Sequence, residues 1–322
     1  MSKIEISYLS KFRSELMGVA SILIILCHAP AHGVVSEGFL HQFLLRCDVG
    51  VDIFLLLSGL GLYFSLDKRK IKLITWYKGR YLKLFVPYLL FAVPTYAWIA
   101  IKNQQSFIDF LFNLSTISYW IDGVGLWFVA MLIPLYFTSP LVYKCAKNGN
   151  AIFLLAVTTI IAMIVGSFAV DGFIRNVFFV IMRYPSFVLG MLCANGILSN
   201  IEIKKKVCII ILFTLTMFVI LRLIIHIQTS MLSVYWILCL AVLIMLEKIF
   251  TISPMFLNLF FRHIGRISLE SYCTNVYWVG CIMLVMPIDT PSVISYTLST
   301  FLCLIFSYGL YKVNLIIIQF LK

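Results

Sequence analysis

Charged residues are scarce in this sequence. They make up 12% of its 322 residues, whereas hydrophobic residues make up 62%. Soluble domains carry about a quarter of their residues as charged side chains, so this composition excludes an ordinary soluble fold. The mean hydropathy of +1.04 points the same way. We therefore expect an integral membrane protein.

Acidic residues are the scarcer of the two charge types, with 13 against 25 basic residues and a net charge of +12. With the N-terminus inside, 20 of the 25 basic residues fall in inner segments. This asymmetry follows the positive-inside rule, which predicts that both termini are cytoplasmic. We expect the chain to lie in the inner (plasma) membrane. It favours anionic membrane lipids over nucleic acid as the partner of the excess charge.

Paired cysteines and internal repeats are also lacking. The nine cysteines show no CxxC spacing, and only Cys47 falls in a predicted outer loop. A disulfide framework and a cysteine metal site are therefore not predicted. The two halves of the chain do not mirror each other, which argues against an inverted-repeat transporter.

Long hydrophobic runs, in contrast, fill the sequence. A window of about 20 residues predicts about ten membrane spans. They cover residues 14–32, 49–66, 84–101, 124–143, 151–169, 176–195, 207–225, 231–246, 267–286 and 293–311. The longest loops, residues 102–123 and 247–266, are too short to fold alone. We predict an all-α, polytopic protein with one membrane-embedded domain over residues 1–322.

The first predicted span carries a histidine deep in the bilayer. At 1.5 Å per helical residue, His28 lies roughly 22 Å from Arg13, in the far half of a hydrocarbon core about 30 Å thick. An ionisable group there is costly and indicates a functional site, although a histidine satisfied by a backbone carbonyl is the alternative. His32 follows, but Pro30 interrupts the turn and no HExxH motif is present, so no metal site is predicted.

Two further charged residues lie within predicted spans. Asp52 enters the second span from the outer side, where its carboxylate would hold the His28 imidazole in one tautomer. The alternative is an N-terminal aspartate favoured by the helix dipole. Arg183 lies near the middle of the sixth span, and a guanidinium there must face protein, water or ligand. We predict that it lines a ligand cavity.

Basic and aromatic residues mark the predicted inner and outer ends of three spans. Arg80 and Lys83, at the inner end of the third span, can bind the phosphates of a nucleotide-bearing donor, and they can equally bind anionic lipid or set orientation. Arg13 opens the first span as a topology anchor or a ligand residue. Trp127 begins the fourth span as part of an aromatic belt or as a platform that stacks on a sugar.

Six segments, in this order, resemble the type 3 family of integral membrane acyltransferases, which typically O-acetylate cell-surface sugars in bacteria. They are ELMGVASILIILCHA at 15–29, GVDIFLLLSG at 50–59, YKGRYLKLFVPY at 77–88, GLWFVAMLIPLY at 125–136, RYPSFVLGML at 183–192 and GRISLESYCTN at 265–275.

The resemblance implies an O-acyltransferase in which His28 acts in acyl transfer and Arg80 and Lys83 serve a cytoplasmic acyl-CoA. The expected donor is acetyl-CoA, with no permanently bound cofactor. The expected acceptor is a cell-surface polysaccharide or its lipid-linked precursor. A transporter or flippase for a glycan or acyl precursor is the alternative that the residues leave open.

The sequence departs from the family pattern at three positions. The arginine that members often carry eleven residues before the histidine falls on Met17, with Arg13 one turn earlier on the same face. We call the segment at 77–88 the basic block. The family's second arginine in this block is replaced here by Lys83, which keeps the charge but cannot form a bidentate contact. The last segment often ends in histidine and here ends in Asn275.

Overall fold

The computed structural model describes residues 4–5, 7–67, 72–168, 172–200, 202–203, 235–287 and 291–321. Within these residues, seven helical segments are long and apolar enough to cross a membrane. They are Arg13–His32, Gly38–Asp67, Leu73–Lys102, Trp127–Lys147, Gly172–Leu198, Tyr235–Ile252 and Ser292–Phe320. The chain is therefore an all-α, polytopic membrane protein, as its hydropathy predicts.

The helices belong to two compact units, which are described one at a time. Unit 1 comprises residues 1–20, 49–70 and 137–265, and unit 2 comprises residues 21–48, 71–136 and 266–322. Helices α2 (Arg13–His28) and α8 (Trp127–Lys147) contribute to both units. The prediction of one domain over the whole chain stays a prediction.

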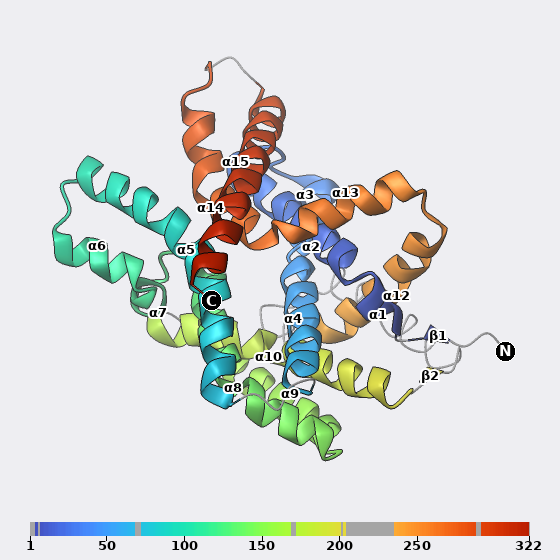
Figure 1. Cartoon of the computed structure of the whole chain (residues 1–322). Helices are drawn as coiled ribbons and strands as arrows, with labels where there is room; N and C mark the ends of the chain where they lie inside the picture. Colours follow the sequence, from blue (N-terminus) through green and yellow to red (C-terminus); the bar gives the residue numbers. More distant parts are fainter. Residues whose placement is uncertain are drawn as a thin grey trace. The chain divides into compact units, whose positions relative to one another are not determined.

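Unit 1 is built around α4 and α10, which pack against each other along their lengths (Figure 1). Most residues of α4 are buried, which matches its almost uninterrupted apolar sequence. Besides parts of α2 and α8, the elements of unit 1 are α1 (Ser7–Lys11), α4 (Val49–Asp67), α9 (Ala151–Phe168), α10 (Gly172–Leu198), α12 (Tyr235–Ile252), α13 (Met255–Arg266) and the two-residue antiparallel strands β1 (Ile4–Glu5) and β2 (Glu202–Ile203).

Unit 2 contains the closely packed pair α14 and α15 (Figure 1). The two helices run antiparallel, because Thr274 bonds Ser307 while Val279, further along α14, packs with Tyr296. Besides parts of α2 and α8, its elements are η1 (Ala29–His32), α3 (Gly38–Arg46), α5 (Leu73–Lys102), α6 (Phe107–Leu114), α7 (Ile117–Asp122), α14 (Ser268–Leu284) and α15 (Ser292–Phe320).

Most predicted spans correspond to helices, with differences at their ends. Helix α5 begins at Leu73 rather than near residue 84, so the basic block lies on a helix. Lysine and arginine are good helix formers, but a hydropathy window excludes them. Helix α12, which is described from Tyr235 to Ile252, corresponds to the predicted span 231–246. The predicted span 207–225 lies outside the described residues, and the count of ten spans and the orientation of the termini stay predictions.

Both predicted loops contain helices. Residues 102–123 include α6 and α7, and residues 247–266 include α13. Helix α6 begins with a capping box, in which the backbone N–H of Asp109 donates to Ser106 Oγ and Ser106 donates back to Asp109 Oδ2. These hydrogen bonds hold the pKa of the exposed Asp109 carboxyl below its usual range.

Candidate active site

Glycines bring the backbones of α4 and α10 into close contact in unit 1. A Cβ added at Gly59 would lie 2.3 Å from the carbonyl oxygen of Phe187, and one at Gly190 would lie 1.9 Å from that of Leu56. Small residues permit such an approach in membranes. We call this contact the α4–α10 interface.

The α4–α10 interface buries a charged pair. Arg183 Nη1 donates to Asp52 Oδ2, and Ser186 Oγ donates to Asp52 Oδ1 at 2.6 Å. The side chains of Asp52 and Arg183 are 0% and 2% exposed. Because burial without a partner is far more costly for each charge than burial as a hydrogen-bonded pair, the two residues stabilise each other's ionised forms.

This pairing gives Arg183 and Asp52 partners that the sequence did not predict. Arg183 was expected to line a ligand cavity, and its guanidinium instead bonds Asp52 and lies 5.9 Å from the ring centroid of Phe179. Asp52 was expected to orient His28, which belongs to unit 2. That pairing, and any contact of Arg183 with a ligand, stay predictions.

Arg13 opens α2 and reaches α4 within unit 1. Its Nε donates to the carbonyl oxygen of Leu57 at 3.0 Å. The guanidinium lies over Gly61, where an added Cβ would be 2.9 Å from Arg13 Nη2. Gly61 therefore leaves room for the Arg13 side chain.

This contact predicts that Gly61→Ala will gain less stability than Gly309→Ala. Alanine is favoured over glycine in a helix by up to about 1 kcal/mol. At Gly309 an added methyl group meets nothing within 4 Å, but at Gly61 it displaces the Arg13 guanidinium. Thermal unfolding of both variants in detergent measures the difference. An equal gain at the two positions would contradict the contact.

Glu15 is almost fully buried and has a basic partner from α13. Its side chain is 1% exposed, and its Oε1 accepts hydrogen bonds from Arg262 Nε at 2.9 Å and Nη2 at 2.6 Å. Gly18 and Gly265 allow this part of α2 to approach α13 closely. The sequence missed this pair, because residues 247–266 read as a loop and the partners are distant in the chain.

His28 lies in unit 2 at the end of α2, beside an apolar cluster to which α2, η1, α3, α14 and α15 contribute. Ile25 and Ala29 pack with Val279 and Tyr296, and the Tyr296 hydroxyl donates to the carbonyl oxygen of Ile25. The Nδ1 atom of His28 is buried and makes no hydrogen bond to any described residue. Within the described residues, this leaves one ring nitrogen of the imidazole available for chemistry.

The neighbouring histidine has a different environment. The His32 ring lies 5.4 Å from the ring of Tyr296, and its Cε1 would be 3.3 Å from a Cβ added at Gly280. His32 lies four residues after His28, at the end of the short 3-10 helix η1 that follows α2. This makes His32 a matched control for any experiment on His28.

The basic block of unit 2 lies on the first turns of α5 and is lined with aromatic rings. The guanidinium carbon of Arg80 lies 5.8 Å from the ring centroid of the buried Trp76, a cation–π contact. Tyr81 donates to the carbonyl oxygen of Ile133 on α8 at 3.0 Å, which fixes this end of α5. Lys83 is exposed on the same helix.

Trp127 begins α8, as predicted for the fourth span, and is half-buried. The next residue ties this helix start to α14, because the backbone N–H of Phe128 donates to the Tyr272 hydroxyl at 3.1 Å. Trp127 therefore occupies a fixed place in unit 2. Its predicted contact with a sugar stays a prediction.

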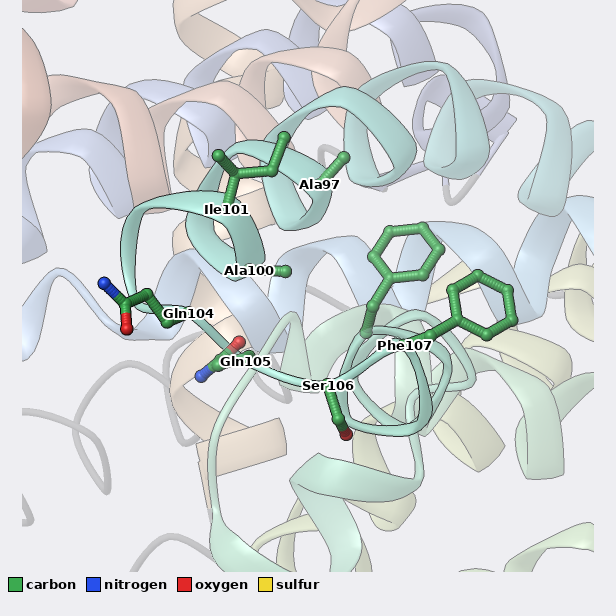
Figure 2. Close-up of a pocket in the computed structure, with 8 residues that line it drawn as sticks. Ala97, Ala100, Ile101, Gln104, Gln105, Ser106 and Phe107 are labelled. Carbon is green, nitrogen blue, oxygen red and sulfur yellow. The ribbon is translucent and has the colours of Figure 1, made fainter.

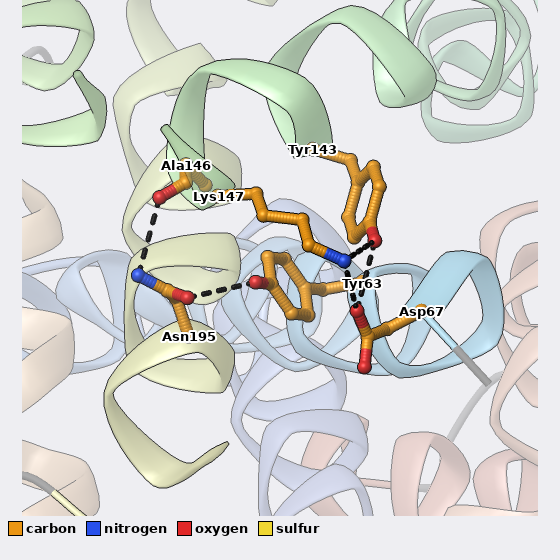
Figure 3. Close-up of polar contacts among 6 residues, drawn as sticks. All are labelled: Tyr63, Asp67, Tyr143, Ala146, Lys147 and Asn195. Carbon is orange, nitrogen blue, oxygen red and sulfur yellow. Dashed lines mark hydrogen bonds and ion pairs between the residues drawn. The ribbon is translucent and has the colours of Figure 1, made fainter. Parts of the chain in front are cut away.

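A polar network joins the ends of α4, α8 and α10 in unit 1 (Figure 3). Tyr63 donates to Asn195 Oδ1 at 2.8 Å, and Asn195 Nδ2 donates to the carbonyl oxygen of Ala146 at 3.1 Å. Beside it, Asp67 accepts hydrogen bonds from Tyr143 at 2.8 Å and Lys147 at 3.0 Å. Tyr63 follows Asp52 on α4, and its partner Asn195 follows Arg183 on α10. The two helices therefore run parallel, as the predicted topology requires.

A pocket of about 450 Å³ lies between α5 and α6 in unit 2 (Figure 2). Ala97, Ala100 and Ile101 of α5 line one side, and Phe107 of α6 lines the other. The turn between the helices adds Gln104, Gln105 and Ser106. The pocket is largely apolar and lies where the predicted span 84–101 meets the predicted loop 102–123.

The predicted site residues divide between the two units. Asp52, Arg183 and Arg13 lie in unit 1, where Arg183 bonds Asp52. Unit 2 holds His28, Arg80, Lys83 and Trp127. Fold and site together define a polytopic membrane protein with a half-buried histidine, whose Nδ1 is buried, at the end of one spanning helix.

A comparison with protein-family models indicates which reaction this membrane protein catalyses. Residues 16–312 match the type 3 model described as an acyltransferase domain. The chain belongs to this family, and it is a membrane acyltransferase. No curated protein and no solved structure matches it.

Proposed function

We propose that the protein is an O-acyltransferase of the inner (plasma) membrane that moves an acetyl group from cytoplasmic acetyl-CoA to a hydroxyl group of a cell-surface glycan. The observation that carries this proposal is His28, a histidine within the matched region whose Nδ1 is buried and makes no hydrogen bond to a described residue. A ring nitrogen in this state can take up a proton or an acyl group.

His28 acts as general base or as nucleophile, and both routes begin with a neutral imidazole. As base, it takes the proton of the acceptor hydroxyl while the oxygen bonds the acyl carbon and the carbon–sulfur bond breaks. The proton then passes to the departing thiolate. As nucleophile, its ring nitrogen displaces the thiolate and carries the acyl group until the hydroxyl accepts it. Both routes yield an O-acylated glycan and free CoA.

The donor's phosphates would bind the basic block of α5. Arg80 is held against Trp76 and is half-buried, which limits the rotamer entropy lost on binding. Its planar guanidinium matches two phosphate oxygens, and Lys83 adds a second positive charge on the same helix. The acceptor is a polysaccharide or its lipid-linked precursor, for which Trp127 supplies a ring that can stack on a sugar.

The donor site predicts that Arg80→Ala will weaken binding of acetyl-CoA about tenfold. Hydrogen bonds to charged groups contribute about 1.5–3 kcal/mol, and 1.4 kcal/mol corresponds to a factor of ten. Binding of acetyl-CoA to the purified protein in detergent measures the change.

Lys102→Ala is the matched control for this experiment. Lys102 lies 5.0 Å from the ring of Trp98, as Arg80 lies over Trp76, but at the opposite end of α5. The control should leave the affinity unchanged. If Arg80→Ala also leaves it unchanged, the basic block does not hold the donor.

A further inference from the structure

Asn275 is a buried asparagine that makes no side-chain hydrogen bond to any described residue. Its side chain on α14 is 2% exposed, and neither Nδ2 nor Oδ1 bonds a described residue. Each unpaired buried group costs roughly 1–3 kcal/mol. Its neighbours are satisfied, since Thr274 bonds Ser307 at 2.8 Å and the Tyr272 hydroxyl accepts from Phe128. A polar group kept at this cost calls for a functional explanation.

The packing of unit 2 places Asn275 within about one helical turn of the level of His28. Val279 follows Asn275 by four residues on the same face of α14, and it packs in the apolar cluster with Ile25 and Ala29. His28 directly precedes Ala29. Asn275 therefore lies up to about 5.4 Å nearer the start of α14, which is its predicted cytoplasmic end.

A second unsatisfied atom lies on the facing helix. Ser299 of α15 is fully buried, and its Oγ has no hydrogen-bond partner among the described residues. It lies between Tyr296, which packs with Val279, and Cys303, whose thiol donates to the carbonyl oxygen of Thr274 at 3.8 Å. Both α14 and α15 thus present unpaired polar groups in the same stretch of their contact.

We propose that the Asn275 carboxamide binds the first amide of the pantetheine arm of acetyl-CoA, with Ser299 beside it. This inference rests on the proposed function. An asparagine offers a donor and an acceptor, which match the carbonyl and N–H of a secondary amide. Two methylene groups separate that amide from the thioester sulfur, a spacing that fits the separation of up to about one turn between Asn275 and His28. A donor that enters from the cytoplasm meets Asn275 before its thioester reaches the histidine.

The proposal predicts that replacing Asn275 by leucine or alanine weakens the use of the donor without weakening the fold. Removing an unpaired amide should leave the unfolding temperature equal or higher in at least one of these variants. The KM for acetyl-CoA should rise about tenfold, since a hydrogen bond to the donor is lost. Asn195→Leu and Asn195→Ala are the controls, because both polar atoms of Asn195 are bonded and its replacement should lower the unfolding temperature.

A shortened donor separates Asn275 from the phosphate site. The acetyl thioester of N-acetylcysteamine keeps the first amide and lacks the phosphates. With this donor, Asn275→Leu should still raise KM about tenfold, whereas Arg80→Ala should have no effect. The same change by Arg80→Ala, or none by Asn275→Leu, would overturn the assignment of the amide.

The outcomes distinguish this inference from the proposed function. If the wild-type protein transfers acetyl groups and both Asn275 variants keep its KM, the inference fails and the function stands. If both variants unfold below the wild type as the Asn195 variants do, Asn275 is a structural residue and the inference also fails. A wild-type protein that neither binds nor uses acetyl-CoA overturns the proposed function, and the inference with it.

Discussion

Replacing His28 with alanine is expected to reduce acyl transfer at least about 100-fold. A positioned base contributes typically 10²–10⁴ in rate, and a nucleophile cannot be replaced by a methyl group at all. The O-acetyl content of the surface polysaccharide, measured in cells at matched membrane expression, reports the change. Release of CoA by the purified protein gives the same comparison without the cell.

His32→Ala is the control for this prediction. His32 lies four residues further along the chain and contacts Tyr296, so its loss removes a similar ring from the same region of unit 2. The control should retain most of the activity. Equal acetylation by the wild type and His28→Ala would remove His28 from the mechanism and leave the family's chemistry to another residue.

Breaking the buried charge pair of unit 1 is expected to lower the free energy of unfolding by about 3–5 kcal/mol. Either Asp52→Ala or Arg183→Ala leaves an uncompensated charge within the α4–α10 interface, where both side chains are almost fully buried. Thermal unfolding in detergent should show similar losses for the two variants. Because the residues share one interaction, the double variant should lose much less than the sum.

A third variant tests whether Asp52 also serves catalysis. The pair Asp52→Leu with Arg183→Met replaces both charges with apolar side chains and should recover much of the lost stability. If it also recovers activity, Asp52 is needed for packing alone. If it is stable and inactive, the sequence-based role of Asp52 in catalysis gains support. Losses from the single variants that simply add would show that the two charges do not depend on each other.

The hydropathy of the sequence predicted most of the fold because lipid leaves a spanning segment few choices. A helix satisfies every backbone group internally, so a long apolar run is enough to predict one. The start of α5 escaped this argument because Lys78 and Arg80 interrupt the apolar pattern without interrupting the helix. Helix α13 was missed for a related reason, since its charged and apolar residues alternate at helical spacing on a short segment.

The candidate site was predicted only in part. Depth in the bilayer singled out His28, and charge within a span singled out Asp52 and Arg183. Their pairing could not be predicted, because 131 residues separate them and each was assigned a different partner. Gly59 and Gly190 could have indicated from the sequence that α4 and α10 pack together. Each is a small residue that follows one member of the charged pair at helical spacing.

The unpaired amide of Asn275 needed the structure. In the sequence it is a departure from a family motif, and nothing in the pattern indicates whether its side chain has partners. The structure shows that the neighbouring Thr274 bonds Ser307 of α15, whereas Asn275 makes no side-chain hydrogen bond to a described residue.

The contact of Gly59 and Gly190 also bears on how variants of this protein are interpreted. A side chain at either position would meet a backbone carbonyl, and a main chain cannot rotate away as a side chain does. Substitutions there would force the two helices apart and shift Asp52 out of line with Arg183. Inactive alleles at these glycines would therefore resemble catalytic mutants in a genetic screen, although neither residue has a functional group to offer a substrate.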